Sequence, residues 1–140
     1  MPYYKKYGFG KEERLSSRKE ITRLFEEGNS FFSYPFNLIW IKSDNKLHFP
    51  AQFAISVSRK SFKKAVTRNR IKRLIREAWR LEKSVLYEYL KQHNICLIVM
   101  LIYIGNDVPR HAELRPKVVE LIRNFSLHLD KSGRSKYSCI

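Results

Sequence analysis

A strand pattern runs directly into a basic helix pattern in the middle of the chain: Phe53-Ala-Ile-Ser-Val-Ser-Arg-Lys60, a short linker, and Lys64-Ala-Val-Thr-Arg-Asn-Arg-Ile-Lys-Arg-Leu-Ile-Arg-Glu-Ala-Trp-Arg80. In the first part large apolar residues alternate with smaller ones, as in a strand with one buried face. In the second part the apolar residues follow helical spacing at Ile71, Leu74, Ile75 and Ala78. We therefore predict a strand followed by an amphipathic helix.

The polar side of this helix is almost uniformly positive. Residues 59–80 contain ten Lys or Arg residues and one acid, Glu77, in a chain of 140 residues with a formal net charge of +15. Like charges one helical turn apart repel by about 0.2 to 0.5 kcal/mol per pair. A solvated helix face usually mixes both signs, so this pattern indicates a polyanionic partner. Nucleic acid is favoured over an anionic membrane surface because the helix lacks exposed aromatic and leucine anchors.

The composition excludes several classes of protein. With 44% hydrophobic and 14% aromatic residues, the chain is too apolar for a disordered basic tail and fits one folded domain. Cys96 and Cys139 make no disulfide framework, and the four histidines show no metal-ligand spacing. The longest apolar run, Ile95–Ile104, is about half of a membrane span. The N-terminus lacks the apolar core of a secretory signal, so we expect a cytoplasmic protein.

The flanking sequence predicts further elements before the basic helix. Ser17 and Glu20 form a capping-box pattern for a helix over residues 18–27, with Gly28 as a left-handed stop. Strands are expected over Phe36–Ile41 and residues 53–57, close enough in sequence to pair antiparallel.

After the basic helix, Glu82 falls on the apolar face, which predicts a break at residues 82–84 and a second helical piece over 84–92. Ile95–Ile104 is expected to be a central strand covered on both faces, with Cys96 as a small core residue. A last helix is expected over 112–129, starting nearer Arg115 because of Pro116. Residues 1–13 and 130–140 are predicted to be flexible flanks of a single domain over 14–129.

The central stretch resembles the protein subunit of bacterial ribonuclease P. Its hallmark is the Arg-Asn-Arg motif, present as Arg68-Asn69-Arg70, and the element order on both sides fits. The resemblance implies an α+β fold, an α/β sandwich like the second domain of ribosomal protein S5. A single mostly antiparallel sheet would carry an N-terminal helix, a C-terminal helix and the basic helix in a left-handed crossover.

The resemblance also implies a function. Such a subunit assists a catalytic RNA that removes the 5′ leader of precursor tRNA by Mg²⁺-dependent endonucleolytic hydrolysis, so the partners are that RNA and precursor tRNA. The metal and the chemistry would belong mainly to the RNA and substrate, and no catalytic or metal-binding residue is predicted in this chain. A protein partner is not implied. The alternatives are a ribosomal or chaperone-like RNA-binding protein and, third, a sequence-specific DNA binder.

The site residues implied by the resemblance are cations around the motif, which would neutralise phosphates, and Asn69, which could reach a sugar or base edge. They are Arg59, Lys60, Lys63, Lys64, Arg68, Asn69, Arg70, Lys72, Arg73, Arg76 and Arg80. The leader would lie in a cleft between the N-terminal helix and the sheet, near Phe25, Arg59 and Lys60.

Three aromatic questions follow from this implied cleft. Family members often carry aromatics where this chain has Ile21 and Ile39, so base stacking is not expected at those two positions. Phe25 is either a stacking residue or a core residue. Trp79 borders the basic stripe and is expected to be a half-buried core residue, with base stacking as the less favoured role.

Overall fold

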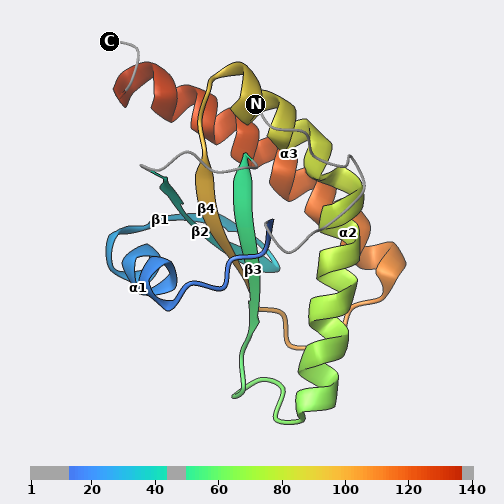
Figure 1. The fold of residues 1–140 in the computed structure, drawn as a ribbon. Coiled ribbons are helices and arrows are strands. Elements are labelled where there is room, and N and C mark those ends of the chain that lie inside the picture. The colour runs from blue at the N-terminus through green and yellow to red at the C-terminus, as the bar shows by residue number, and fades with distance from the viewer. Residues whose placement is uncertain (1–12, 44–49, 137–140) are drawn as a thin grey trace.

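A computed structural model describes residues 13–43 and 50–136 of the chain, with side chains described up to residue 130. Within these described residues, four strands and three helices follow one another (Figure 1). They are α1 (Arg18–Glu27), β1 (Asn29–Ser33), β2 (Phe36–Lys42), β3 (Ala51–Val57), α2 (Ala65–Gln92), β4 (Leu97–Tyr103) and α3 (His111–Lys136).

The strands form one mixed sheet in the order β1-β2-β4-β3. β2 pairs antiparallel with β1 and with β4, whereas β3 pairs parallel with β4 after the crossover through α2. The prediction that the strands now seen as β2 and β3 pair with each other is wrong. β4 is apolar on both faces and takes the position between them, where helices cover both of its faces.

β1 was not predicted from the sequence. Three of its five residues are Asn or Ser, which hides the strand pattern, and only Phe31 packs on the main core. A Tyr34–Pro35 turn with a cis peptide bond connects β1 to β2.

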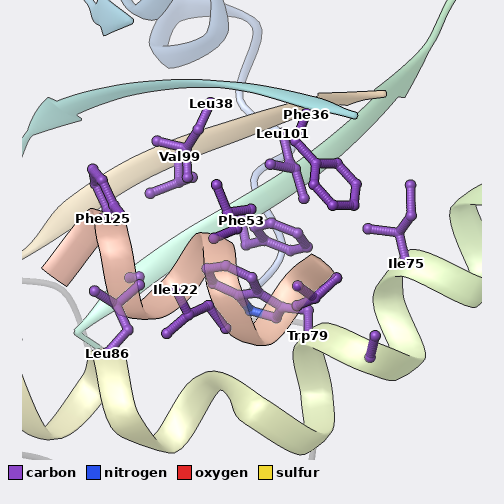
Figure 2. Close-up of a cluster of buried hydrophobic side chains, with 14 of the residues drawn as sticks. Phe36, Leu38, Phe53, Ile75, Trp79, Leu86, Val99, Leu101, Ile122 and Phe125 are labelled. Carbon is purple, nitrogen blue, oxygen red and sulfur yellow. The ribbon is translucent and has the colours of Figure 1, made fainter. Parts of the chain in front are cut away.

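The main core fills the space between the sheet and the helices α2 and α3. Figure 2 shows side chains of the strands facing those of the two helices, with Trp79 of α2 against Phe53 of β3. These two rings stack with centroids 4.0 Å apart and planes 4° apart, and Trp79 is fully buried. A smaller cluster on the other face of the sheet buries Leu24 of α1 against Ile98 and Met100 of β4.

α2 is one continuous helix of 28 residues, so the predicted break at residues 82–84 is wrong. Its buried stripe continues from Trp79 through Lys83 to Leu86, Tyr87 and Leu90. Glu82 forms an ion pair with Arg115 of α3, in which Glu82 Oε1 lies 3.1 Å from Arg115 Nη2. The charge of Glu82 is therefore compensated where α2 meets α3. A helix can keep such a charge when a neighbouring element supplies the partner.

Lys83 is buried in the same stripe because its partner comes from the start of the described chain. The carboxylate of Glu13, also buried, accepts hydrogen bonds from Lys83 Nζ and from the Tyr87 hydroxyl, the latter at 2.8 Å. Leu15 is buried as well, and its backbone N–H donates to the Phe53 carbonyl at 3.0 Å. The expected loose N-terminal segment is therefore packed from Glu13 onwards; residues 1–12 lie outside the described part.

The predicted N-terminal helix is confirmed as α1, and the Ser17 hydroxyl accepts from the Glu20 N–H at 3.4 Å. Gly28 is not a left-handed stop, because its backbone is extended (φ −69°, ψ 156°). A Cβ atom at Gly28 would lie 2.2 Å from the Leu24 carbonyl oxygen and 2.7 Å from Ile39 Cγ2. Glycine is needed here for close approach to the sheet.

The C-terminal helix α3 is longer than expected at both ends. It begins at His111, with the Arg110 carbonyl accepting from the Glu113 and Leu114 N–H groups, and it runs past Leu129 to Lys136. Pro116 lies inside the helix, where it has no N–H to donate to the carbonyl of Ala112, one turn earlier. The helix thus continues into the segment predicted to be a flexible tail, and residues 137–140 lie outside the described part.

Candidate RNA-binding surface

The linker after β3 and the outer side of α2 carry most of the predicted cations at the surface. We call eight of these residues the cationic surface; all are exposed except Lys72, which is half-buried. They are Arg59, Lys60, Lys63, Lys64, Arg70, Lys72, Arg73 and Arg76. Within residues 13–43 and 50–130, none of them forms an ion pair with an acid. The surface therefore presents uncompensated charge to solvent.

The fold creates this surface by holding the opposite side of α2. Ile71, Ile75 and Ala78 are fully buried against the sheet, and Leu74 is partly buried beside them, as the helical spacing predicted. The residues between them must therefore face outward. Asn69, in the centre of the Arg-Asn-Arg motif, is also exposed. An Arg-rich array on a rigid helix suits phosphate, which guanidinium groups bind through two parallel hydrogen bonds.

Arg68 differs from its neighbours because its side chain is used within the protein. The guanidinium Nη1 donates hydrogen bonds to the carbonyl oxygens of Phe62 and Lys63, both at 2.8 Å. These carbonyls belong to the linker that enters α2. Arg68 therefore fixes the path of the linker. The Lys60 N–H donates to the Ser58 hydroxyl at 3.1 Å in the same segment.

Arg80 also has a partner within the chain. Its guanidinium contacts both carboxylate oxygens of Glu77, with Nε 3.1 Å from Oε2. The hydrogen bond from Arg80 lowers the pKa of Glu77, so the carboxylate stays ionised. This local pair removes net charge from the end of the predicted basic stripe, which is why we leave Arg80 out of the cationic surface.

Two aromatic expectations are settled by burial. Trp79 is fully buried and stacked on Phe53, so it cannot reach a base, and the expectation of a half-buried residue underestimated its burial. Phe25 is 55% exposed on α1, which excludes the core role and leaves its ring accessible.

Cys96 precedes β4 and is partly exposed, so it is not the core residue that the sequence predicted.

On the face of the sheet that carries α1, one row of residues is only partly covered. Phe32, Asn37, Ile102 and Ser56 are successive partners across β1, β2, β4 and β3, and we call them the open row. Phe32 is 64% exposed and the other three are half-buried. Towards the other end of the sheet, α1 buries Ile98 and Met100. The open row therefore lies at the end of β3 from which the linker departs.

The described residues contain no group of three His, Cys, Asp or Glu side chains able to hold a metal ion. They also include no helix long and apolar enough to cross a bilayer. The cationic surface itself offers phosphate contacts from the linker and α2, next to a sheet face on which the ring of Phe32 is exposed.

The described residues thus form an α+β fold with an uncompensated cationic surface, as is typical of proteins that bind polyanions. The family model described as Ribonuclease P matches residues 9–122, and this chain belongs to the ribonuclease P protein family. It is thus a protein component of a ribonucleoprotein endoribonuclease. Membership in this family implies association with the ribonuclease P RNA.

Individual relatives agree with this assignment. The ribonuclease P protein component of Porphyromonas gingivalis is 36% identical over 104 residues, covering 74% of this chain and 75% of the relative. That of Chlorobium phaeobacteroides is 35% identical over 127 residues, covering 84% and 87%.

Solved structures of such proteins confirm the predicted fold class. The RNase P protein of Thermotoga maritima matches with a TM-score of 0.63 at 25% identity, over 80% of this chain and 96% of that one. The Staphylococcus aureus protein matches with a TM-score of 0.63 at 22% identity, over 83% and 96%.

Proposed function

We propose that this chain binds the ribonuclease P RNA through its cationic surface and holds the 5′ leader of precursor tRNA on the α1 side of the sheet. In this way it assists Mg²⁺-dependent endonucleolytic removal of the leader. The observation that carries the proposal is the continuity of the two regions: the linker that ends the open row begins the cationic surface.

The two regions suit different parts of the RNA. Uncompensated Lys and Arg side chains on α2 match a folded RNA, whose phosphates are dense and whose helices are recognised mainly through the backbone. A flat sheet face with an accessible ring instead suits a single strand, because only unpaired bases expose their faces. Arg59 and Lys60, at the junction, are placed to contact leader phosphates.

The magnesium ions fit the RNA and the substrate better than this protein. Two-metal hydrolysis of a phosphodiester needs carboxylates or phosphates that converge on the ions, and the described acids do not converge. Two acids of α2 are already paired within the protein, Glu77 with Arg80 and Glu82 with Arg115. The protein's share of the work is therefore binding and orientation.

The direct test is cleavage of precursor tRNA by a bacterial ribonuclease P RNA at low Mg²⁺, with and without this protein. We expect strong stimulation and a product that begins at the mature 5′ end, while the protein alone cleaves nothing. Stimulation should fall for the double variant Arg73→Gln/Arg76→Gln. Its matched control, Lys117→Gln/Arg123→Gln, removes the same charge from exposed positions of α3.

Two results would overturn the proposal. One is the absence of stimulation despite tight binding of the RNA, which would indicate an RNA-binding protein without a processing role. The other is an equal loss of stimulation in the α2 and α3 double variants, which would mean that total charge, rather than the cationic surface, is responsible.

A further inference from the structure

We propose that Phe32 is a base-stacking residue for the single-stranded leader, at the end of the open row opposite the cationic linker. This inference rests on the proposed leader binding and adds a residue that the family resemblance did not indicate. Phe32 is 64% exposed, more than the two other exposed aromatic residues of the described part, Phe25 and Tyr34, and it lies on edge strand β1.

The register of the sheet places the ring on the correct face. Phe31, its neighbour, packs on the main core with its ring 5.7 Å from that of Phe125. Successive side chains of a strand point to opposite faces, so Phe32 lies on the α1 face. Its strand partner Asn37 accepts a 2.8 Å hydrogen bond from the Ser30 hydroxyl, which places polar groups beside the ring.

Ile39, where family members often carry an aromatic, is covered in this protein. It is half-buried, and the backbone of Gly28 approaches it so closely that a Cβ there would lie 2.7 Å from Ile39 Cγ2. A larger aromatic ring at position 39 would displace the backbone at Gly28, where α1 joins β1. Phe32 lies on the same face, diagonally across the β1–β2 pair from Ile39, and it is largely exposed. It supplies a ring where position 39 cannot.

The distance across the open row suits a short single strand. Phe32 and Ser56 are separated by three inter-strand spacings, about 14 Å, and Arg59 and Lys60 follow Ser56 within four residues. A nucleotide chain crossing the row would place one base on Phe32 and its phosphates near the linker. A duplex would offer the ring only paired base edges and backbone, so the occupant is the unpaired leader.

The test is a double-mutant cycle in the holoenzyme assembled from this protein and a bacterial ribonuclease P RNA. The protein variants are Phe32→Ala, Phe32→Leu and Phe32→Tyr, with Leu127→Ala on α3, 57% exposed, as the matched control. The substrates are precursor tRNAs with a long unpaired leader, the same leader with one abasic nucleotide at each position in turn, and a single-nucleotide leader.

Stacking on Phe32 predicts roughly tenfold weaker binding of the long-leader substrate by Phe32→Ala. Phe32→Leu should lose as much affinity, because leucine keeps an apolar side chain but has no ring. Phe32→Tyr should retain binding. One abasic position should weaken binding to the unsubstituted holoenzyme and have no further effect in Phe32→Ala. The single-nucleotide leader should be bound equally by all variants.

The outcomes separate this inference from the function on which it rests. If the unsubstituted holoenzyme binds long and single-nucleotide leaders equally, leader binding itself is wrong. If it prefers the long leader but Phe32→Ala and Phe32→Leu match Leu127→Ala, leader binding stands and the role of Phe32 is refuted. Stacking at one base would likewise be refuted if, in the Phe32→Ala holoenzyme, abasic substitution lowered the affinity equally at every leader position.

Discussion

The guanidinium of Arg68 donates a 2.8 Å hydrogen bond to the carbonyl oxygen of Phe62, on the linker that leads into its own helix. The motif that identifies the family therefore contains arginines with different tasks. Arg68 closes the linker onto α2, whereas Arg70 is exposed and has no acidic partner in the described residues. Arg68 thereby places Arg59, Lys60 and Lys63 relative to the helix.

This difference predicts different phenotypes for two alanine variants. Arg68→Ala should lower the free energy of unfolding by about 1 to 2 kcal/mol, since hydrogen bonds from a charged donor are lost. Arg70→Ala should leave it within about 0.5 kcal/mol, as is usual for a surface substitution. Both should weaken binding to the ribonuclease P RNA. Urea denaturation measures the free energy of unfolding, and filter binding measures the affinity for RNA. Equal stability of the two variants would show that the Arg68 contacts contribute nothing to the stability of the fold.

Binding to the ribonuclease P RNA should fall steeply as salt rises, because each neutralised phosphate releases bound counterions. Arg73→Gln should reduce the slope of log K against log salt by about 0.7 to 0.9 if Arg73 contacts one phosphate. Arg123→Gln on α3 should leave the slope unchanged. Titrations over a range of KCl concentrations test this, and an unchanged slope for Arg73→Gln would remove that residue from the RNA contact.

The Phe53–Trp79 stack predicts a variant that affects folding alone. Trp79→Ala should lower the free energy of unfolding by about 3 to 5 kcal/mol, the usual loss for a large buried aromatic. Under conditions where the variant remains folded, its affinity for RNA should match that of the unsubstituted chain, because the ring is fully buried. Weaker binding by a demonstrably folded variant would instead mean that Trp79 contributes to the surface.

The buried contact of Glu13 with Lys83 predicts a stability defect that depends on pH. Burial lowers the pKa of Lys83, while the hydrogen bond and charge of Glu13 raise it. Glu13→Gln removes that support, so the folded form of the variant should carry Lys83 with a still lower pKa. Breaking such a pair costs about 3 to 5 kcal/mol when the lysine stays charged.

The sign of the pH effect follows from proton binding. With a folded pKa below the ordinary lysine value, the unfolded chain binds more protons, and stability rises with pH in that window. The deficit of Glu13→Gln should therefore be largest near neutral pH and shrink towards the ordinary pKa of lysine. Denaturation at several pH values tests this, with exposed Glu120→Gln as control; a deficit that grows with pH would contradict it.

Local patterns were sufficient to predict α1, the central strand β4 and the apolar side of α2, because each depends on residues within one element. They failed where a partner lies far along the chain. Glu82 on the apolar face indicated a break because Arg115 of α3 was not in view, and the burial of Lys83 depends on Glu13, 70 residues earlier. The pairing of β3 with β4 likewise depends on a crossover of 28 helical residues, which periodicity does not describe.

The candidate site shows the same division. The outward direction of Arg70, Arg73 and Arg76 followed from the helical period, because their apolar neighbours had to face the core. The inward use of Arg68 did not, since it depends on the path of the linker. Phe32 was missed because its strand is short and polar; the two adjacent phenylalanines, Phe31 and Phe32, were the available signal for a strand with aromatics on both faces.

The strand order also affects how this protein is synthesised. β4 is the last strand to leave the ribosome, yet it pairs with both β2 and β3. Until Tyr103 has emerged, the nascent chain therefore holds two strands with unpaired inner edges, and the buried side of α2 has only part of its core. A fragment that ends after α2 is not a smaller version of the domain but an aggregation-prone chain with open edges.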